Sequence, residues 1–244
     1  MNTCYLCGYQ IENEIDCSRD HVPPRQFFPK AFRDTYPDGF WVLPTHKKCN
    51  TSYQRDEDYF FFSSIPLTAF TPMEAEMWGE LQRRINGDVE NMEEVKAKGR
   101  VPRSSLFPLL MRINDEFKDR TPEGIVMPKG NVVKDFDWPR THKVLWKIVR
   151  GLFFKDYGRV LKEDLPHQIN NVRPGKSVPD CFVPVIAETP KGQYRKYFDY
   201  VVKEGKVSDG HFYSWGLAFW NSLGYFVSFT NPDCTCTKCH KGRA

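Results

Sequence analysis

Residues 4–7 read Cys-Tyr-Leu-Cys, residues 20–24 read Asp-His-Val-Pro-Pro, and residues 46–50 read His-Lys-Lys-Cys-Asn. The first and last stretches each hold two metal-binding side chains separated by two residues, a spacing that lets a tight turn direct both ligand atoms at one ion. Three thiols and one imidazole are a sufficient ligand set for one tetrahedral zinc ion. The sequence therefore predicts a structural Zn²⁺ site with the ligands Cys4, Cys7, His46 and Cys49.

A second group of side chains has a different chemistry. Asp20 and Asn50 offer hard oxygen ligands, which suit Mg²⁺ or Mn²⁺ better than they suit zinc. His21 titrates near neutral pH and can accept a proton from an attacking water. These three residues therefore suit magnesium binding and proton transfer rather than zinc storage.

In the order of these motifs, residues 1–62 resemble the HNH, or ββα-metal (His-Me finger), endonucleases in their zinc-ribbon form. The resemblance implies a module of two strands and a helix, with His21 as the general base and Asp20 and Asn50 as ligands of a catalytic Mg²⁺ or Mn²⁺ ion. The family often has Cys where this chain has His46. It also usually has an Asn before the second strand, where this chain reads Gly39-Phe40-Trp41.

The elements expected within this module are a strand over residues 17–21, a second strand over 40–43, and a helix from Asn50 through residue 62. Val22-Pro23-Pro24 ends the first strand, because proline cannot donate to a strand ladder. On the expected helix, Gln54 and Glu57 lie one and two turns after Asn50. They either add oxygen ligands or are surface polar residues, and the surface reading is favoured.

The leading function is an endonuclease that hydrolyses phosphodiester bonds in DNA. Two alternatives stay open: a non-catalytic, zinc-dependent protein that binds nucleic acid, and a nuclease that cuts RNA. The Asp-His pair favours catalysis, because a purely structural zinc ribbon does not need it. Stand-alone proteins of the resembled family often act in phage defence, restriction or mobile elements, and the resemblance extends that expectation to this chain.

Composition limits the class of protein. The chain of 244 residues has no apolar run long enough to span a bilayer and no signal peptide at its start, which predicts a cytoplasmic protein without a membrane partner. Eight cysteines in such a chain favour metal binding over disulfides. The net charge is +4, of which residues 1–65 carry −2 and the remainder +6. Either the remainder supplies the phosphate contacts, or this charge is ordinary for its length.

The rest of the chain predicts an α+β fold. We expect a nuclease module over 1–65 and a second domain over 66–244 that binds DNA, a protein partner or another copy of the chain. Helices are expected over 71–98, 104–118 and 141–161. Four strands are expected as an antiparallel sheet with the last helix on one face: residues 182–186, 194–202, 212–220 and 225–229. Their aromatic residues are interpreted as core, with stacking on bases as the alternative.

Two further patterns leave alternatives open. The helix over 141–161 has a basic face formed by Lys143, Lys147 and Arg150, which is either solvated or in contact with phosphates. The C-terminal segment contains four further ligand types within seven residues, which indicate a second zinc site or a tail without a metal. These residues are Cys234, Cys236, Cys239 and His240. Their match to a haem-attachment motif is discounted, because no export signal precedes it.

Overall fold

The computed structural model describes residues 2–35, 39–68, 75–81 except 78, 137–172, and 178–231 except 179, 193, 195 and 209. Within these ranges the chain is a mixture of helices and strands, as the predicted α+β class requires. The strands are β1 (Asn2–Thr3), β2 (Gln10–Ile11), β3 (Cys17–His21), β4 (Val42–His46), β5 (His167–Val172), β6 (Phe198–Val207), β7 (Gly210–Phe219) and β8 (Leu223–Asn231). The α-helices are α1 (Lys30–Thr35), α2 (Lys47–Thr51), α3 (Gln54–Ser64), α6 (Trp138–Tyr157) and α7 (Val183–Ile186). The 3₁₀ turns are η1 (Glu14–Asp16), η2 (Arg25–Phe27), η3 (Ile65–Thr68) and η4 (Asp180–Phe182).

The chain forms two compact units, and each contains segments from distant parts of the sequence. The first unit comprises residues 1–23, 41–49 and 145–244, and the second comprises residues 24–40 and 50–144. The residues of the predicted zinc site and the C-terminal sheet therefore belong to the same compact unit. The domain boundary expected between residues 65 and 66 stays a prediction, because most of the chain between 66 and 136 lies outside the described residues.

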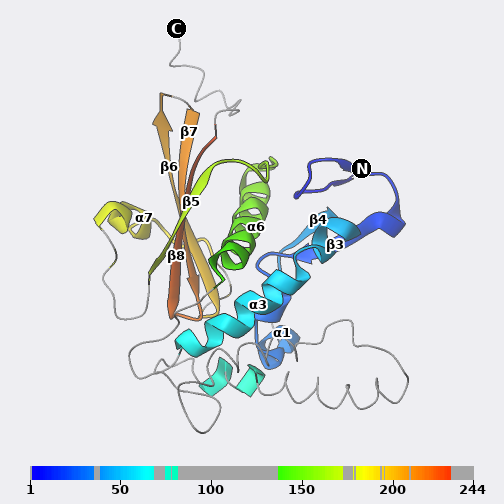
Figure 1. Ribbon diagram of the computed structural model, residues 1–244, viewed down its shortest axis with the longest axis horizontal. Coiled ribbons are helices and arrows are strands. Elements are labelled where there is room, and N and C mark those ends of the chain that lie inside the picture. The colour runs from blue at the N-terminus through cyan, green and yellow to red at the C-terminus, as the bar shows by residue number, and fades with distance from the viewer. Residues whose placement is uncertain are drawn as a thin grey trace. The chain divides into compact units, whose positions relative to one another are not determined.

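The first unit contains a four-stranded antiparallel sheet in the order β5-β8-β7-β6 (Figure 1). The three strands expected over 194–202, 212–220 and 225–229 correspond to β6, β7 and β8. Their aromatic residues alternate between two faces, and Tyr200, Tyr213 and Trp215 are each no more than 1% exposed. The core interpretation of these three side chains is therefore confirmed, and they are not available to stack on bases.

The strand predicted over residues 182–186 is wrong. Residues 182–186 form the end of η4 and the short helix α7, and the strand at the sheet edge is β5, which pairs with β8. Pro184 lies inside the predicted segment and cannot donate to a ladder. The segment of β5 reads His-Gln-Ile-Asn-Asn-Val, whose polar composition suits an edge strand but is not typical of strand sequences.

Helix α6 packs against one face of this sheet (Figure 1), as expected. The ring of Phe153 meets the rings of Tyr213 and Phe229 at centroid distances of 5.1 and 6.0 Å. Trp146 stacks on His167 of the edge strand at 4.1 Å and donates from Nε1 to the Glu163 carbonyl. These contacts place the apolar face of α6 where its periodicity predicts.

The basic face predicted for this helix is not a solvated surface. Lys147 and Arg150 are each 1% exposed, and only Lys143 is substantially accessible. Arg150 donates to the carbonyl oxygens of Leu161 and Leu6. Both alternatives, solvation and phosphate contact, are therefore wrong for Lys147 and Arg150. Local periodicity could not reveal this, because their partners come from other parts of the chain.

The N-terminal elements have the expected order of strand, strand and helix. β3 covers the residues predicted for it and pairs antiparallel with β4, so that Cys17 lies opposite His46 and His21 opposite Val42. β4 begins two residues later than expected and runs directly into α2. The single helix expected from Asn50 is divided into α2 and α3, because the chain turns at residues 52–53.

The second unit has its own aromatic core. Phe27 stacks on Phe60 and Phe61 of α3 at centroid distances of 5.1 and 6.4 Å. Asp56, at the start of α3, pairs with Arg140 and Lys143, each at 2.8 Å. These contacts join α3 to the first turns of α6.

Several predictions from the sequence fall beyond the described ranges. The helix expected over 71–98 lies mostly outside the described residues, and the helix over 104–118 and the four C-terminal ligand residues lie entirely outside them. Among the helices that are described, none has the length and apolar character needed to cross a membrane.

Candidate metal centre and its surroundings

The first two cysteines lie in a tight turn between β1 and β2. The backbone N–H of Cys4 donates to the Tyr9 carbonyl at 2.9 Å, and that of Gly8 donates to the Cys4 carbonyl at 2.8 Å. Gly8 has φ +79°, a left-handed conformation that a residue without Cβ adopts at little cost. This turn directs the two thiols of the Cys-Tyr-Leu-Cys stretch to one side.

The last two ligands come from the junction of β4 and α2. His46 ends the strand, and Cys49 lies in the helix that follows. The Nδ1 atom of His46 lies 3.2 Å from Sγ of Cys7, and the backbone N–H of His46 donates to Sγ of Cys4 at 3.3 Å. The ligand atoms of Cys4, Cys7, His46 and Cys49 all lie within 4.8 Å of one another. We call these four residues the Cys/His cluster.

The electrostatics of the Cys/His cluster favour a cation. Burial acts to raise the pKa of Cys4, but hydrogen bonds from the Thr45 hydroxyl and nearby backbone N–H groups outweigh it and lower this pKa to about 6. Burial and then the negative charges of Cys4 and Cys7 raise the pKa of Cys49 to about 12. Thiolates this close repel one another, and a divalent ion removes that repulsion and deprotonates all three thiols. The Cys/His cluster could therefore hold a structural metal ion such as zinc.

Asp20 is buried in β3 and already has a cationic partner. Its exposed fraction is 5%, and its Oδ2 atom lies 2.8 Å from Nζ of Lys147. The hydroxyl of Tyr5 donates to the same Oδ2 atom. Tyr5 stands between the two cysteines of the first turn and is itself 0% exposed. The carboxylate thus connects this turn to α6.

His21 and Asn50 occupy the positions expected within their elements. His21 is the last residue of β3 and is half-buried. As its neighbour on a strand, it projects to the face opposite Asp20, so the burial of Asp20 against α6 does not bury the imidazole. Asn50 follows Cys49 within α2 and is also half-buried. Whether Asp20 and Asn50 share an ion stays a prediction.

Gln54 and Glu57 differ in their surroundings. Gln54 is exposed, as its surface interpretation requires. Glu57 is 8% exposed and accepts a hydrogen bond from Nε2 of Gln26 at 3.3 Å, so the surface interpretation is wrong for it. The periodicity of α3 does not reveal this burial, because Gln26 belongs to a turn far back in the sequence.

Three residues around the site were missed by the sequence reasoning. Tyr5, Lys147 and Arg150 connect the first turn, Asp20 and α6 by hydrogen bonds and an ion pair. Only Tyr5 could have been found from the sequence, because it lies between the two cysteines of the first predicted ligand pair. Nothing in the local sequence of α6 distinguishes Lys147 or Arg150 from solvated basic residues.

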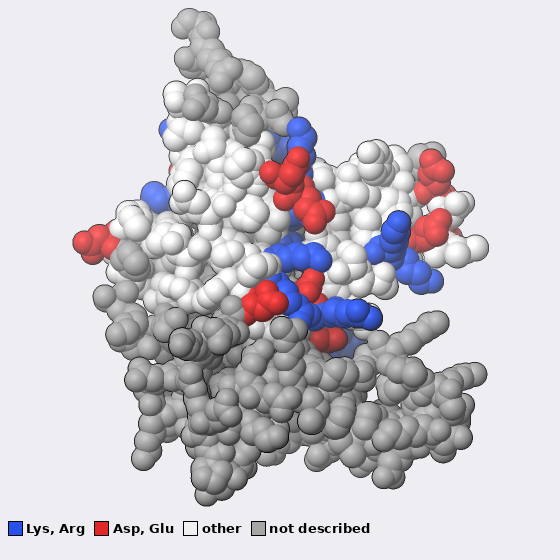
Figure 2. Space-filling model, in the orientation of Figure 1, with Lys and Arg blue, Asp and Glu red and all other residues white. Residues whose placement is uncertain are grey.

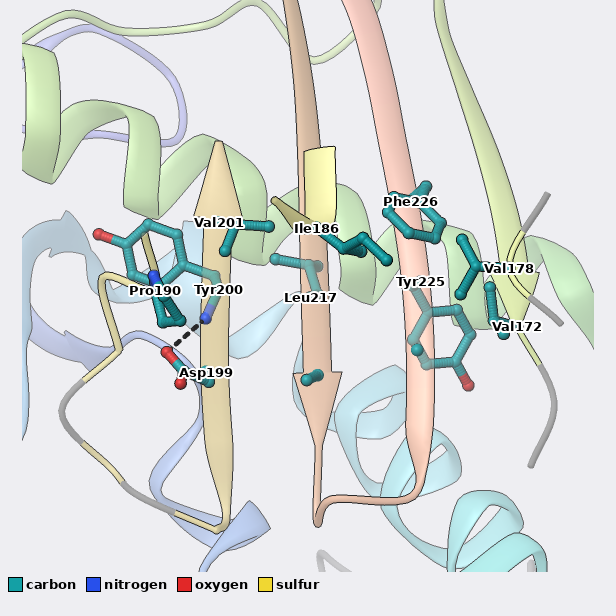
Figure 3. A pocket seen from close by; sticks show the side chains of 13 residues that line it. Val172, Val178, Ile186, Pro190, Asp199, Tyr200, Val201, Leu217, Tyr225 and Phe226 are labelled. Carbon is teal, nitrogen blue, oxygen red and sulfur yellow. Dashed lines mark hydrogen bonds between the residues drawn. The ribbon is translucent and has the colours of Figure 1, made fainter. Parts of the chain in front are cut away.

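A second feature of the first unit is an apolar pocket on the sheet face opposite α6 (Figure 3). Its volume is about 250 Å³, and Val172, Ile186, Val201 and Phe226 contribute to its wall. The one acidic residue of the lining, Asp199, accepts hydrogen bonds at Oδ1 from the backbone N–H groups of residues 192 and 200. Its described lining residues include no cysteine, serine, histidine or lysine and a single carboxylate, so we assign no chemistry to it.

The surface charge of the described residues is mixed. Figure 2 shows Lys and Arg side chains next to Asp and Glu side chains on the face in view. Among the described residues, ion pairs such as Lys203–Glu188 and Lys143–Asp56, each at 2.8 Å, bring opposite charges together. The described residues on this face therefore do not present a surface of one sign.

A scan against protein-family models and searches of curated proteins and solved structures found no match for the chain. Membership of the HNH endonucleases is therefore not shown.

Proposed function

We propose that the protein is a metal-dependent endonuclease that hydrolyses phosphodiester bonds in DNA, with His21 as its general base. The observation that supports this most is the antiparallel β3–β4 pair followed by α2, with the Cys/His cluster at one end and His21 at the other. A half-buried imidazole at a strand end is accessible enough to accept a proton from water.

The residues present fit a catalytic divalent ion in part. Asp20 uses Oδ2 for Tyr5 and Lys147, and the described part of the chain places no hydrogen-bond or ion-pair partner at Oδ1. One carboxylate oxygen therefore remains for an ion, with the side chain of Asn50 as the second proposed ligand. When bound, Mg²⁺ or Mn²⁺ would neutralise charge on the scissile phosphate and the leaving oxygen.

The test is cleavage of supercoiled plasmid in the presence of Mg²⁺ or Mn²⁺. His21→Ala should lower the cleavage rate by about two to four decades, the usual effect of losing a general base. Ser18→Ala, on the same strand, is the control and should cleave like the wild type. The melting temperature and plasmid binding of His21→Ala should stay unchanged. Cleavage at the wild-type rate by His21→Ala would refute the proposed base.

The Lys147–Asp20 pair favours a second candidate function, binding of nucleic acid without cleavage. A carboxylate neutralised by a buried ammonium is a weaker ligand for a catalytic ion than a solvated one. In that case the wild-type protein should retard plasmid in a gel and leave it supercoiled with either ion. An RNA substrate in the same assay distinguishes an RNA-cutting enzyme from both.

A further inference from the structure

We propose that Lys147 is the resident counter-ion of Asp20, and that it controls how tightly this carboxylate binds a divalent cation. The inference deepens the proposed function and rests on its assignment of the catalytic ion to Asp20. It concerns a positioning residue supplied by α6, far in sequence from the motif that it serves.

The first step is the burial of the pair. The side chains of Lys147 and Asp20 are 1% and 6% exposed, and lysine is almost never fully buried unless it is paired. Removing one member of a buried ion pair leaves the other as an uncompensated charge, which is strongly unfavourable. Asp20 therefore needs a cation whether or not the protein performs catalysis.

The second step is that the position of Lys147 is fixed. One turn after it along the helix face, Arg150 is held by the carbonyl oxygens of Leu6 and Leu161. The indole of Trp146 donates to the Glu163 carbonyl. The ammonium group is thus delivered by a helix that cannot easily rotate away.

The third step is competition between Lys147 and a divalent cation for the carboxylate of Asp20. Lys147 and Tyr5 both contact Oδ2, whereas Oδ1 has no hydrogen-bond or ion-pair partner among the described residues. A divalent cation at Oδ1 would lie close to the ammonium group and be repelled by it in a poorly solvated site. Binding of the ion should therefore be weak until a further anion, such as a nucleic-acid phosphate, joins the site.

The test measures thermal stability without nucleic acid, so its result does not depend on cleavage. Zinc-loaded Lys147→Met should melt roughly 10 °C below the wild type in magnesium-free buffer, because Asp20 loses its counter-ion. Millimolar MgCl₂ should recover a large part of this loss, since the hard ion takes the place of the ammonium group. The wild type should not respond. NaCl of equal ionic strength controls for screening.

Three variants make the interpretation specific. Lys147→Arg keeps the charge and should not respond to Mg²⁺. The double variant Asp20→Asn, Lys147→Met has no charge at either position of the pair, so it should be more stable than Lys147→Met and, unlike it, should not respond to Mg²⁺. Lys203→Met removes a surface lysine that pairs with Glu188 and should change nothing.

The outcomes separate cleanly. Recovery of Lys147→Met by Mg²⁺, with none in the double variant, supports the inference. An insoluble Lys147→Met with a folded double variant also supports it. A Lys147→Met protein that ignores Mg²⁺, or failure of both variants to fold, overturns it, because then packing of the side chain and not its charge is what Asp20 requires. A wild-type protein that does not cleave plasmid would refute the proposed function and would leave the stability result unchanged.

Discussion

The hydroxyl of Tyr5 donates a hydrogen bond to the carboxylate of Asp20. Tyr5 lies in the turn between Cys4 and Cys7 of the Cys/His cluster, and Asp20 precedes the proposed general base. The turn that could hold a structural ion and the strand that carries the proposed catalytic residues are therefore connected by one buried bond.

Tyr5→Phe should lower the free energy of unfolding by about 1–3 kcal/mol, because a buried carboxylate loses a hydrogen-bond donor. Urea unfolding measures the change, and zinc content should stay the same. Tyr9→Phe is a matched control, since Tyr9 is 75% exposed. Equal stability of Tyr5→Phe and wild type would show that the bond contributes nothing.

The Cys/His cluster should bind about one zinc ion per chain, because its four ligand atoms meet the needs of a tetrahedral site. Cys7→Ser and Cys49→Ser should lose this ion and give protein that is insoluble or rapidly digested by protease, because zinc binding contributes to folding. Elemental analysis and limited proteolysis check both points.

Cys181→Ser provides the control for the zinc experiment. Cys181 is an exposed free cysteine outside the Cys/His cluster, so its replacement should leave the zinc content and the digestion pattern unchanged. A wild-type protein that is folded and free of metal would contradict the assignment of a structural ion.

Gly151→Ala should destabilise the protein. A Cβ atom at this position would lie 2.7 and 2.8 Å from the two γ-carbons of Val22, closer than packed atoms can approach. The expected loss is about 1–3 kcal/mol, measured by thermal or urea unfolding. Adding Val22→Ala makes room for the new methyl group, so the double variant should lose less than the sum of the single changes. Strict additivity would argue against this close approach.

Stability should fall steeply at alkaline pH. Burial, followed by the negative charge of Asp156, raises the pKa of Tyr200 far above its ordinary value. In the unfolded chain this tyrosine ionises near pH 10, so the stabilisation is complete below that pH and decreases above it. Tyr200→Phe should reduce the slope of unfolding free energy against pH above about pH 10 by about 1 kcal/mol per pH unit. Tyr9→Phe should leave the slope unchanged.

Local sequence patterns predicted the elements that depend on neighbouring residues alone. The strand over 17–21 follows from its position before two prolines, and the two ligand pairs follow from their spacing, which a tight turn and a strand–helix junction realise. The segment over 182–186 was misread because its β-branched and aromatic residues also occur in a short surface helix, in which only Val185 is buried and which Phe182 precedes by stacking on Phe226. Composition alone does not separate these two states.

Local patterns did not predict the surroundings of the charged residues of α6. Lys147 and Arg150 have the spacing of a solvated face, and their burial follows only from partners that the fold brings to them. A helix periodicity of 3.6 residues describes one helix and carries no information about a carboxylate elsewhere in the chain. The surroundings of Asp20 were therefore beyond prediction from the motif that contains it.

The bond between Arg150 and the Leu6 carbonyl joins residues 144 positions apart. A ribosome adding about 5–20 residues each second needs several seconds or more to cover that separation. During this interval the turn that contains Cys4 and Cys7 has emerged without its α6 contacts, and Asp20 has no ammonium partner. If the Cys/His cluster captures zinc early, the ion would hold the nascent turn in place until α6 is synthesised, and metal supply would then limit the yield of folded protein.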